Sequence, residues 1–306
     1  MTAEKIFYFI GVTTGQSSVN RLFPIWMEIL GRPDVVLQGI DHQINDRPKA
    51  YRTTVERIKS DPNAVGGLIT THKLSLSAAA GDLFDHFGRY AELTSEVSCI
   101  AKRGDKLWGF AKDAISSGKA LRKILGEEYF THSHGDLFSL GAGGAAVATL
   151  LNLMLEEDKG NRPRRFIAAD IDTERLAHAE AISKKVIHDI DMSLHHVQSA
   201  VENDALMARL PQGSVIINAT GMGKDRPGSP ISSAALFPRN GVVWEFNYRG
   251  ERLFYQQALA QSSRQSLTVV DGWEYFLLGW LEVVTEVLQI ELTHELFEKI
   301  KAASTR

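Results

Sequence analysis

The sequence predicts an α/β protein with two α/β domains and mostly parallel sheets. The chain of 306 residues is long enough for two domains with sizeable cores. Short apolar runs, typical of buried strands, alternate with stretches of helical spacing. Near the middle of the chain, a glycine-rich turn joins a strand to a helix and starts a second series of such elements. This alternation favours parallel sheets, because parallel neighbours need a long crossover connection.

The first series of elements predicts an N-terminal domain. A hairpin is expected from 97–102 and 106–111, because Arg103-Gly-Asp105 supplies a turn between two apolar runs. The helix expected at 115–125 contains the domain boundary, so the first domain is predicted to comprise residues 1–115. Its other predicted elements are strands at 6–12, 35–40 and 66–70 and helices at 21–30, 50–60 and from about Ser75.

The second series predicts a Rossmann-type domain at residues 116–250. Residues 251–306 are expected to form C-terminal helices that pack back on the first domain. The predicted strands lie at 137–140, 165–169, 195–198, 214–218 and 242–246. The predicted helices lie at 145–157, 172–185, 205–210, 254–261, 273–289 and 293–302.

The turn after the strand at 137–140 is a candidate dinucleotide site. It has the form G-x-G-x-x-A, with Gly141, Gly143 and Ala146 at the marked positions. Gly141 permits a tight turn, Gly143 lets backbone N–H groups approach a pyrophosphate, and small residues let the helix pack close to the strand. The alternative is a turn that serves packing alone, but the strand-to-helix context favours a cofactor. The predicted contacts are Gly141, Ala142, Gly143, Gly144 and Ala145.

The composition argues against several other classes of function. A net charge of −3 gives no electrostatic reason to expect nucleic acid or an anionic membrane as partner. No apolar run approaches the ~20 residues of a membrane span, and the N-terminus lacks a secretory leader, so we expect a cytoplasmic protein. Cys99 is the single cysteine, which suits a reducing compartment. The histidines at 132, 134, 195 and 196 match no metal-ligand spacing, so no metal site is predicted.

A series of motifs over nearly the whole chain resembles the shikimate/quinate dehydrogenase family. Although no single match is specific, six or more in the right order make a specific signal. The resemblance implies two α/β domains with the active site in the cleft between them, and reversible hydride transfer between nicotinamide and a ring alcohol or ketone. The matching positions are Ser17, Lys73, Asp113, Gly141–Ala145, Asn218–Thr220, Glu245–Tyr248 and Asp271–Gly272.

The resemblance implies that Lys73 and Asp113 are the catalytic pair. A hydroxyl that loses hydride must also lose its proton, and a desolvated lysine can be tuned to accept it. A nearby carboxylate can orient both the ammonium and the substrate hydroxyl. Taken alone, Lys73 reads as a surface lysine and Asp113 as a helix N-cap, and the order of the motifs over the whole chain favours the catalytic interpretation instead.

Several positions depart from the family pattern where its members grip the substrate. Only Lys73 is in register with the family's N-V-T-x-P-x-K segment, and the positions of an asparagine and a glutamine hold Ser98 and Gly279. Lost hydrogen-bonding partners usually mean another substrate. His72 and Lys112 are additional polar residues here, which either bind an acidic substrate or face solvent. The substrate contacts that we expect are Ser17, Ser18, Thr70, Thr71, Ser98 and Tyr248.

The residues after the strand at 165–169 indicate the choice of cofactor. An acid at the end of this strand binds the adenosine ribose and repels a 2′-phosphate, which an arginine would attract. Asp170 takes the acidic position, Ile171 falls where phosphate-binding relatives carry arginine, and Asp172 adds negative charge. We therefore predict NAD in preference to NADP. The resemblance adds Asn218, Ala219, Thr220 and Gly272 to the expected cofactor contacts.

Three functions remain open from the sequence. The first is an NAD-dependent dehydrogenase for a hydroxylated cyclic carboxylate of the shikimate/quinate type, with a place in aromatic amino acid biosynthesis. The second is a dehydrogenase for a different small hydroxy acid, which the altered substrate positions favour. The third is a non-catalytic relative that senses NAD or a metabolite. The expected partner is a small-molecule hydroxy acid, and the chain is expected to be a monomer or a homodimer.

Overall fold

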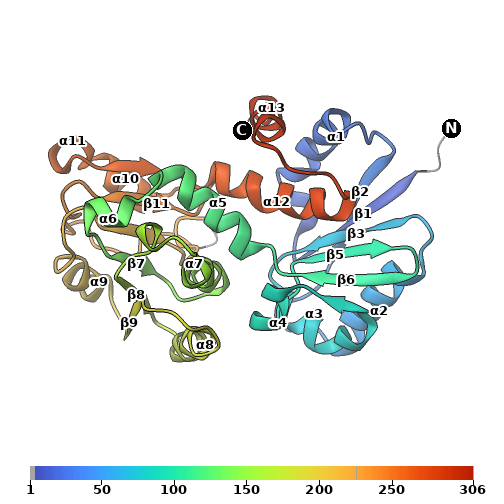
Figure 1. Ribbon diagram of the computed structural model, residues 1–306, viewed down its shortest axis with the longest axis horizontal. Coiled ribbons are helices and arrows are strands. Elements are labelled where there is room, and N and C mark those ends of the chain that lie inside the picture. Colours follow the sequence, from blue (N-terminus) through green and yellow to red (C-terminus); the bar gives the residue numbers. More distant parts are fainter. Residues whose placement is uncertain (1–3, 225, 306) are drawn as a thin grey trace. The chain divides into compact units, whose positions relative to one another are not determined.

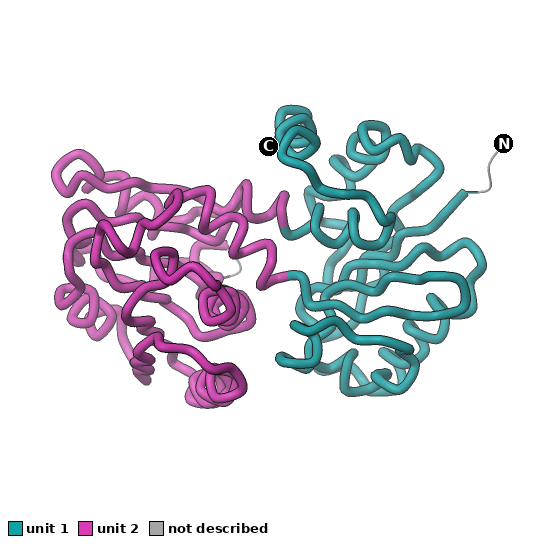
Figure 2. The backbone as a smooth tube through the Cα atoms, viewed as in Figure 1, with its two compact units in different colours: residues 1–112, 279–306 teal, residues 113–278 magenta. Residues whose placement is uncertain are grey.

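The computed structural model describes residues 4–224 and 226–305. The chain divides into two compact units, which Figure 2 colours separately. Unit 1 comprises residues 1–112 and 279–306, and unit 2 comprises residues 113–278. Unit 1 is therefore built from two separate stretches of the chain, whereas unit 2 is one continuous stretch.

Unit 1 is organised around a mixed sheet with the order β2-β1-β3-β5-β6-β4 (Figure 1). β1 pairs in parallel with β2 and β3, whereas β5 runs antiparallel to both β3 and β6. The predicted hairpin at Arg103-Gly-Asp105 is therefore confirmed. The strands are β1 (Lys5–Gly11), β2 (Val35–Asp41), β3 (Ala64–Ile69), β4 (His86–Phe87), β5 (Cys99–Arg103) and β6 (Lys106–Phe110).

The helices of unit 1 pack the apolar side chains that the sequence places at helical spacing. Tyr51, Val55 and Ile58 of α2 are buried in one cluster with Tyr8 and Ile10 of β1. The helices are α1 (Val19–Ile29), α2 (Pro48–Ser60), α3 (Lys73–Ala80), α4 (Arg89–Thr94), the part of α12 (Trp273–Leu288) from Gly279 onward, and α13 (His294–Ala303).

The end of the chain is fastened to the first part of unit 1. The Trp26 Nε1–H donates to Ser304 Oγ at 2.8 Å, and both side chains are buried. The rings of Phe9 and Trp280 meet edge to face with their centroids 4.8 Å apart. The first contact places the end of α13 beside α1, and the second places α12 against β1.

Unit 2 is organised around an all-parallel sheet with the order β12-β11-β10-β7-β8-β9 (Figure 1). Read from β9, this is the Rossmann order 3-2-1-4-5-6, in which ligands bind where the strand order reverses. The reversal lies between β7 and β10. The strands are β7 (Leu137–Leu140), β8 (Arg165–Asp170), β9 (Asp191–His196), β10 (Val215–Asn218), β11 (Val242–Glu245) and β12 (Thr268–Val270).

Helices in unit 2 follow most of its strands. They are α5 (Asp113–Leu125), α6 (Tyr129–Ser133), α7 (Gly144–Leu155), α8 (Thr173–Ser183), α9 (Ala200–Met207), α10 (Leu253–Leu259), α11 (Ser262–Gln265) and the first part of α12. Phe138 and Ile216 of the central strands are fully buried, in one cluster with Phe254 of α10.

The segment 251–278 lies with unit 2 rather than with the C-terminal helices on the first domain. Its short strand β12 pairs with β11, with Thr268 beside Val242, and so completes the second sheet. Three residues give too little alternation to be recognised as a strand from sequence. β9 also begins earlier than expected, because Asp191 pairs with Arg165.

Two kinds of site are absent from the part of the chain that the structure describes. Within residues 4–224 and 226–305, no helix is long and apolar enough to cross a membrane. The same residues contain no cluster of three or more histidine, cysteine or carboxylate side chains that could hold a metal ion.

Candidate functional site

The glycine turn lies at the point where the second sheet reverses its strand order. Gly141 has φ of +101°, and a Cβ there would lie 3.0 Å from the Ala219 carbonyl oxygen in the loop after β10. Only glycine suits this backbone at such a close approach. Gly143 is the N-cap of α7, and a Cβ at this position would meet nothing within 4 Å. The space beside the Gly143 backbone, at the start of α7, fits an anionic phosphate.

Asp170 holds the glycine turn in place through hydrogen bonds that the sequence did not predict. The Ala142 N–H donates to Asp170 Oδ2 at 2.7 Å, and the Asp172 N–H donates to Asp170 Oδ1 at 3.0 Å. The Asp170 side chain is only 5% exposed. Its carboxylate thus ties the end of β8 to the glycine turn after β7. Asp172 caps α8 by accepting from the N–H groups of Glu174 and Arg175.

Arg175 is a second residue of this region that the motif did not reveal. Its guanidinium lies 3.9 Å from Asp170 Oδ2 and 3.5 Å from Asp172 Oδ2. The side chain is half exposed, at 50%. The two carboxylates therefore offset the positive charge of Arg175.

A cleft of about 500 Å³ opens beside these residues within unit 2. Its lining comes from the ends of β8 and β10 and from the segments after β9 and β10. Ile171 projects at this cleft with 62% of its surface exposed. The cleft has room for the adenosine end of a dinucleotide. The lining residues that bear on recognition are Asp170, Ile171, Arg175, Thr220 and Arg226.

Asn218, at the end of β10, organises the loop that follows. Its Nδ2 donates to the Glu245 carboxylate at 2.9 and 3.1 Å and to the Met222 carbonyl at 3.3 Å. Its Oδ1 accepts from the Thr220 hydroxyl at 2.6 Å and from the Thr220 N–H at 3.2 Å. Asn247 Nδ2 adds a second bond to Met222, at 2.8 Å. The predicted Asn218–Thr220 contact segment is therefore a braced loop.

Glu245 is the buried anchor of this network. It has no solvent-exposed surface, and burial raises the pKa of its carboxyl to about 7, against the opposing hydrogen bonds from the Asn247 N–H and Asn218. Glu245 on β11 reaches Asn218 at the end of the neighbouring strand β10.

The Asp271–Gly272 motif starts α12. Asp271 Oδ1 accepts from the Trp273 N–H at 3.1 Å, and its Oδ2 accepts from Arg252 at 2.8 Å. A Cβ on Gly272 would lie 2.0 Å from the Phe246 carbonyl oxygen, so only glycine fits there. Tyr248 stacks on Phe276 of α12 with centroids 4.2 Å apart, in an aromatic group with Trp273.

In unit 1, Lys73 is the first residue of α3 and is partly buried. The turn before it contains Thr71, at a left-handed φ of +48°. The Thr70 hydroxyl donates to the Ile10 carbonyl at 3.4 Å, whereas Thr71 is exposed. The predicted substrate contacts Thr70 and Thr71 thus lie between the end of β3 and Lys73.

The other predicted substrate residues of unit 1 differ in how free they are. Ser17 and Ser18 are partly buried at the start of α1, and Ser17 Oγ accepts from the Val19 N–H at 3.4 Å. Ser98 is only 2% exposed, and its Oγ accepts from the Lys112 N–H at 2.8 Å. The Ser98 hydroxyl is therefore committed to the backbone beside it.

For His72 and Lys112, the sequence left two alternatives, binding an acidic substrate or facing solvent. The second alternative is wrong. Lys112 Nζ forms an ion pair with Glu286 at 2.6 Å, and its side chain is 11% exposed. His72 is 2% exposed and is hydrogen-bonded to Tyr51. The sequence could not reveal these partners because they lie on α12 and α2, far away along the chain.

Asp113 is the first residue of α5 in unit 2. A carboxylate at the start of a helix is stabilised by the helix dipole. Burial raises the pKa of the Tyr275 hydroxyl, and the charge of the Asp113 carboxylate raises it further. Asp113 therefore lies near Tyr275, in the first turn of α12.

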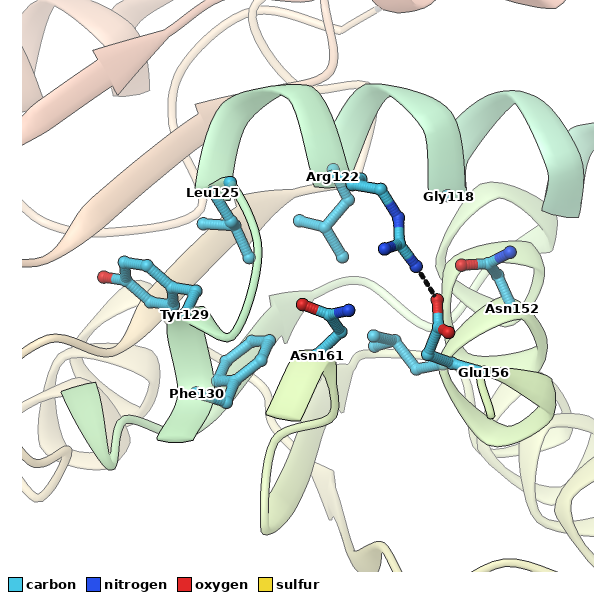
Figure 3. Close-up of a pocket in the computed structure, with 11 residues that line it drawn as sticks. Gly118, Arg122, Leu125, Tyr129, Phe130, Asn152, Glu156 and Asn161 are labelled. Atoms are coloured by element: carbon cyan, nitrogen blue, oxygen red, sulfur yellow. Dashed lines mark hydrogen bonds and ion pairs between the residues drawn. The ribbon is translucent and has the colours of Figure 1, made fainter. Parts of the chain in front are cut away.

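A smaller cavity between α5 and α7 does not fit a cofactor (Figure 3). It holds about 20 Å³, which is room for about one water molecule. Figure 3 shows that Arg122 and Glu156 form an ion pair at its edge. The dinucleotide site is therefore expected in the larger cleft beside Asp170.

Comparison with known proteins adds to this geometry. No family model matches the chain. A shikimate dehydrogenase (NADP(+)) of Streptococcus gordonii is 28% identical over 169 residues, which are 54% of this chain and 53% of the relative. The chain thus spans about half the length of the curated relatives that it matches.

Solved structures match over almost the whole chain. Quinate dehydrogenase from Corynebacterium glutamicum in complex with NAD has a TM-score of 0.74 at 17% identity, covering 99% of this chain and all of that one. The ligand-free 5-ketofructose reductase of Gluconobacter sp. strain CHM43 has a TM-score of 0.71 at 17% identity, with the same coverage. The chain is therefore similar in sequence to shikimate dehydrogenases over about half its length, and it shares its fold with structures of shikimate and quinate dehydrogenases over nearly its whole length.

Proposed function

We propose that the protein is an NAD-dependent oxidoreductase that transfers a hydride between nicotinamide and a hydroxylated cyclic carboxylate of the shikimate/quinate type. The observation that carries the proposal is the glycine turn at Gly141–Ala145, braced by Asp170 where the parallel sheet reverses its order. The open space at Gly143 and the N–H groups that begin α7 fit a pyrophosphate. When bound, the nicotinamide accepts or supplies the hydride.

The residues of this chain would handle binding and the proton. The first turn of α7 binds the pyrophosphate, and the loop braced by Asn218 borders the cleft. Lys73 accepts the substrate hydroxyl proton at Nζ during oxidation, and Asp113 orients the substrate hydroxyl. General base catalysis of this kind contributes about 10²–10⁴-fold to a rate.

A panel of cyclic and linear hydroxy acids, read by nicotinamide absorbance, tests the function. We expect the wild type to reduce NAD with a cyclic hydroxy acid, and Lys73→Ala to lower kcat by about 10²-fold or more because the base is lost. The affinity for NAD, measured by calorimetry, should stay unchanged in this variant. Oxidation of no hydroxy acid by the wild type would contradict the proposal.

A second candidate is a dehydrogenase for a different small hydroxylated compound. It is supported by the changed positions Ser98 and Gly279 and by a 5-ketofructose reductase with the same fold. A panel in which a linear or keto-sugar substrate exceeds every cyclic carboxylate in kcat/KM would favour this candidate.

The preference for NAD rests on the charges beside Ile171. Asp170 and Asp172 are negative, and both lie within 4 Å of the Arg175 guanidinium. Ile171 itself offers no positive charge to a 2′-phosphate. The Asp170 carboxylate is already bonded to two backbone N–H groups, so we propose that it repels the phosphate mainly through its charge.

The variant Ile171→Arg tests this preference. It should raise kcat/KM with NADP by about tenfold or more, because an arginine can pair with a phosphate at this position. Ile187→Arg is the matched control, since Ile187 is fully exposed in the same unit and lies outside the cleft. A wild type that uses NADP better than NAD would refute the proposed preference.

A further inference from the structure

We propose that His72, held by Tyr51, is a positioning residue that fixes the turn from which Lys73 extends and keeps the place beside that lysine uncharged. This inference deepens the proposed function, because it assigns the support of the proposed base. His72 directly precedes Lys73 and forms the N-cap of α3. Its side chain does not reach solvent, so it acts through Lys73 rather than on a substrate.

The turn before Lys73 needs such a support. Thr71 has a left-handed φ of +48°, which costs energy for a β-branched residue. The next residue, His72, is buried to 98% and its Nδ1 lies 3.0 Å from the Tyr51 hydroxyl. The hydrogen bond ties the turn to α2, an element from another part of unit 1. A strained turn persists only where its surroundings hold it in place.

The contacts of Tyr51 determine where its hydroxyl proton lies. The Tyr51 oxygen accepts from the Asp46 N–H at 3.2 Å. Two acceptors are in reach of the proton, His72 Nδ1 at 3.0 Å and the Gln43 carbonyl at 3.4 Å. The shorter contact assigns the proton to His72. A neutral His72 then carries its own hydrogen on Nε2.

Packing alone does not explain why a histidine occupies position 72, because its Nε2 atom gains little there. It is buried and has no well-formed hydrogen-bond partner in the described part of the chain. A phenylalanine would fill the space without leaving a polar atom unsatisfied. The imidazole adds the bond to Tyr51 and polar interactions with the backbone of Gly11 and His42.

Burial, rather than the groups that face His72, is the main reason why the imidazole stays neutral. Those groups are Tyr51 on α2, His42 and Asp46 in the segment before α2, and Lys73 next to it in sequence. Burial lowers the pKa of His72, and the charge of His42 lowers it further, whereas hydrogen bonding to the backbone of Gly11 and His42 and the charge of Asp46 oppose the shift. Asp46 is itself engaged by His42 Nδ1 at 2.9 Å, and His42 Nε2 lies 2.9 Å from the Thr54 hydroxyl.

Acidification would reverse the hydrogen bond. A proton from solvent adds to His72 Nδ1, which then donates to the Tyr51 oxygen, and the tyrosine hydrogen turns to the Gln43 carbonyl. No bond other than this N–H is formed, and the ring gains one positive charge. The hydrogen bond between His72 and Tyr51 is kept with its direction reversed, and the added charge lies next to Lys73 in the chain, where it disfavours protonation of the lysine amine.

The first test is independent of activity. Nitrogen-15 NMR of histidine-labelled wild type should show His72 neutral at pH 7 with its hydrogen on Nε2. A charged ring, or a hydrogen on Nδ1, would overturn the inference. Acetylation of Lys73 by acetic anhydride, followed by mass spectrometry, should become at least threefold faster in Tyr51→Phe and His72→Phe, because a looser turn exposes the amine more often.

The matched control is Tyr8→Phe. Tyr8 is also a buried tyrosine of unit 1, and its hydroxyl donates to Asp61 at 2.8 Å. This variant should leave the labelling of Lys73 unchanged. Equal labelling rates in the wild type and in Tyr51→Phe would overturn the positioning role, and Tyr51→Phe keeps the test valid if His72→Phe fails to fold.

The pH profile of kcat gives the readout that a purely structural role would not move. In the wild type, activity should fall on the acid side with a slope of two protons once His72 titrates, and with a slope of one proton in His72→Phe. We expect kcat to fall about tenfold in both variants with little change in the KM for NAD. If the wild type oxidises no hydroxy acid, the proposed function fails, while the NMR and labelling results still decide the role of His72.

Discussion

At the residue scale, Asp170 links the proposed chemistry of the cofactor to the shape of its turn. Its two carboxylate oxygens accept from the N–H groups of Ala142 and Asp172, so the negative charge is placed by the backbone rather than by a ligand. Hydrogen bonds to a charged group are the stronger kind. One side chain therefore shapes the phosphate-binding turn and supplies charge to the neighbouring cleft.

The variant Asp170→Asn should weaken both features. An asparagine keeps one acceptor and places an NH₂ against a backbone N–H, which costs about 1–3 kcal/mol of stability for the unsatisfied group. We expect the affinity for NAD to fall about tenfold, as measured by calorimetry, together with a lower Tm. Asp172→Asn, which changes the cap of α8, should cost stability but leave NAD affinity within about twofold. Equal loss of affinity in both variants would contradict this account.

The buried Glu245 carboxyl leads us to predict that the stability of the protein depends on pH. Its pKa is raised from 4.5 to about 7, so between these values the folded state keeps a proton that the unfolded state has released. Unfolding therefore releases a proton, and stability falls as pH rises through this window. The shift corresponds to about 3 kcal/mol, which is fully lost above pH 7.

Denaturant unfolding between pH 4.5 and 8 measures this contribution. Glu245→Gln removes the titration, so the difference in stability between wild type and variant should change across the window in the stated direction. A difference that is constant with pH would show that Glu245 does not titrate there. Because Glu245 anchors Asn218, the loop at 219–223 should loosen in the same pH range.

At the scale of elements, the proposed pyrophosphate site lies at the first turn of α7. Gly143 has φ of −74°, which any residue can adopt, and a Cβ there would meet nothing within 4 Å. The fold itself thus does not require glycine at this position, in contrast to Gly141 and Gly272. A phosphate bound at the helix N-terminus would account for a glycine here.

The variant Gly143→Ala separates binding from folding. We expect the Tm to change little and the affinity for NAD to fall at least tenfold, because the methyl group would occupy the approach of the pyrophosphate. Gly279→Ala is the matched control, since it too adds a methyl into open space, and inside α12 it should stabilise the protein by up to about 1 kcal/mol. Unchanged NAD affinity in Gly143→Ala would place the phosphates elsewhere.

At the scale of the whole molecule, the two units are built differently along the chain. Unit 2 is the continuous stretch 113–278, with its own parallel sheet and its own buried core around Phe138 and Ile216. Unit 1 combines 1–112 with 279–306 and closes through contacts such as that between Trp26 and Ser304. A continuous stretch with a complete sheet has what it needs to fold by itself.

We therefore expect a fragment of residues 113–278 to fold and to bind NAD. Circular dichroism should report mixed helix and strand with a cooperative thermal transition. Calorimetry should give an affinity for NAD within about tenfold of the full chain, while the fragment should have no dehydrogenase activity because it lacks Lys73. A fragment that folds without binding NAD would contradict the assignment of the cofactor to the cleft beside Asp170.

The sequence by itself determined the class of fold, most elements and the position of the glycine turn. These features depend on local patterns: apolar periods of two or 3.6 residues, glycine where the backbone must turn, and polar caps such as Asp172. The cofactor turn could be predicted because its spacing lies within a few residues. Segments as short as β12, with three residues, carried no comparable pattern.

The tertiary structure alone decided which side chains are free and which are committed. Asp170 bonds across to Ala142, Lys112 pairs with Glu286, Glu245 holds Asn218, and His72 is held by Tyr51. The partners in each of these pairs are 21 to 174 positions apart in the chain. Burial and pairing at such distances depend on how strands and helices pack, which a local pattern of residues does not encode.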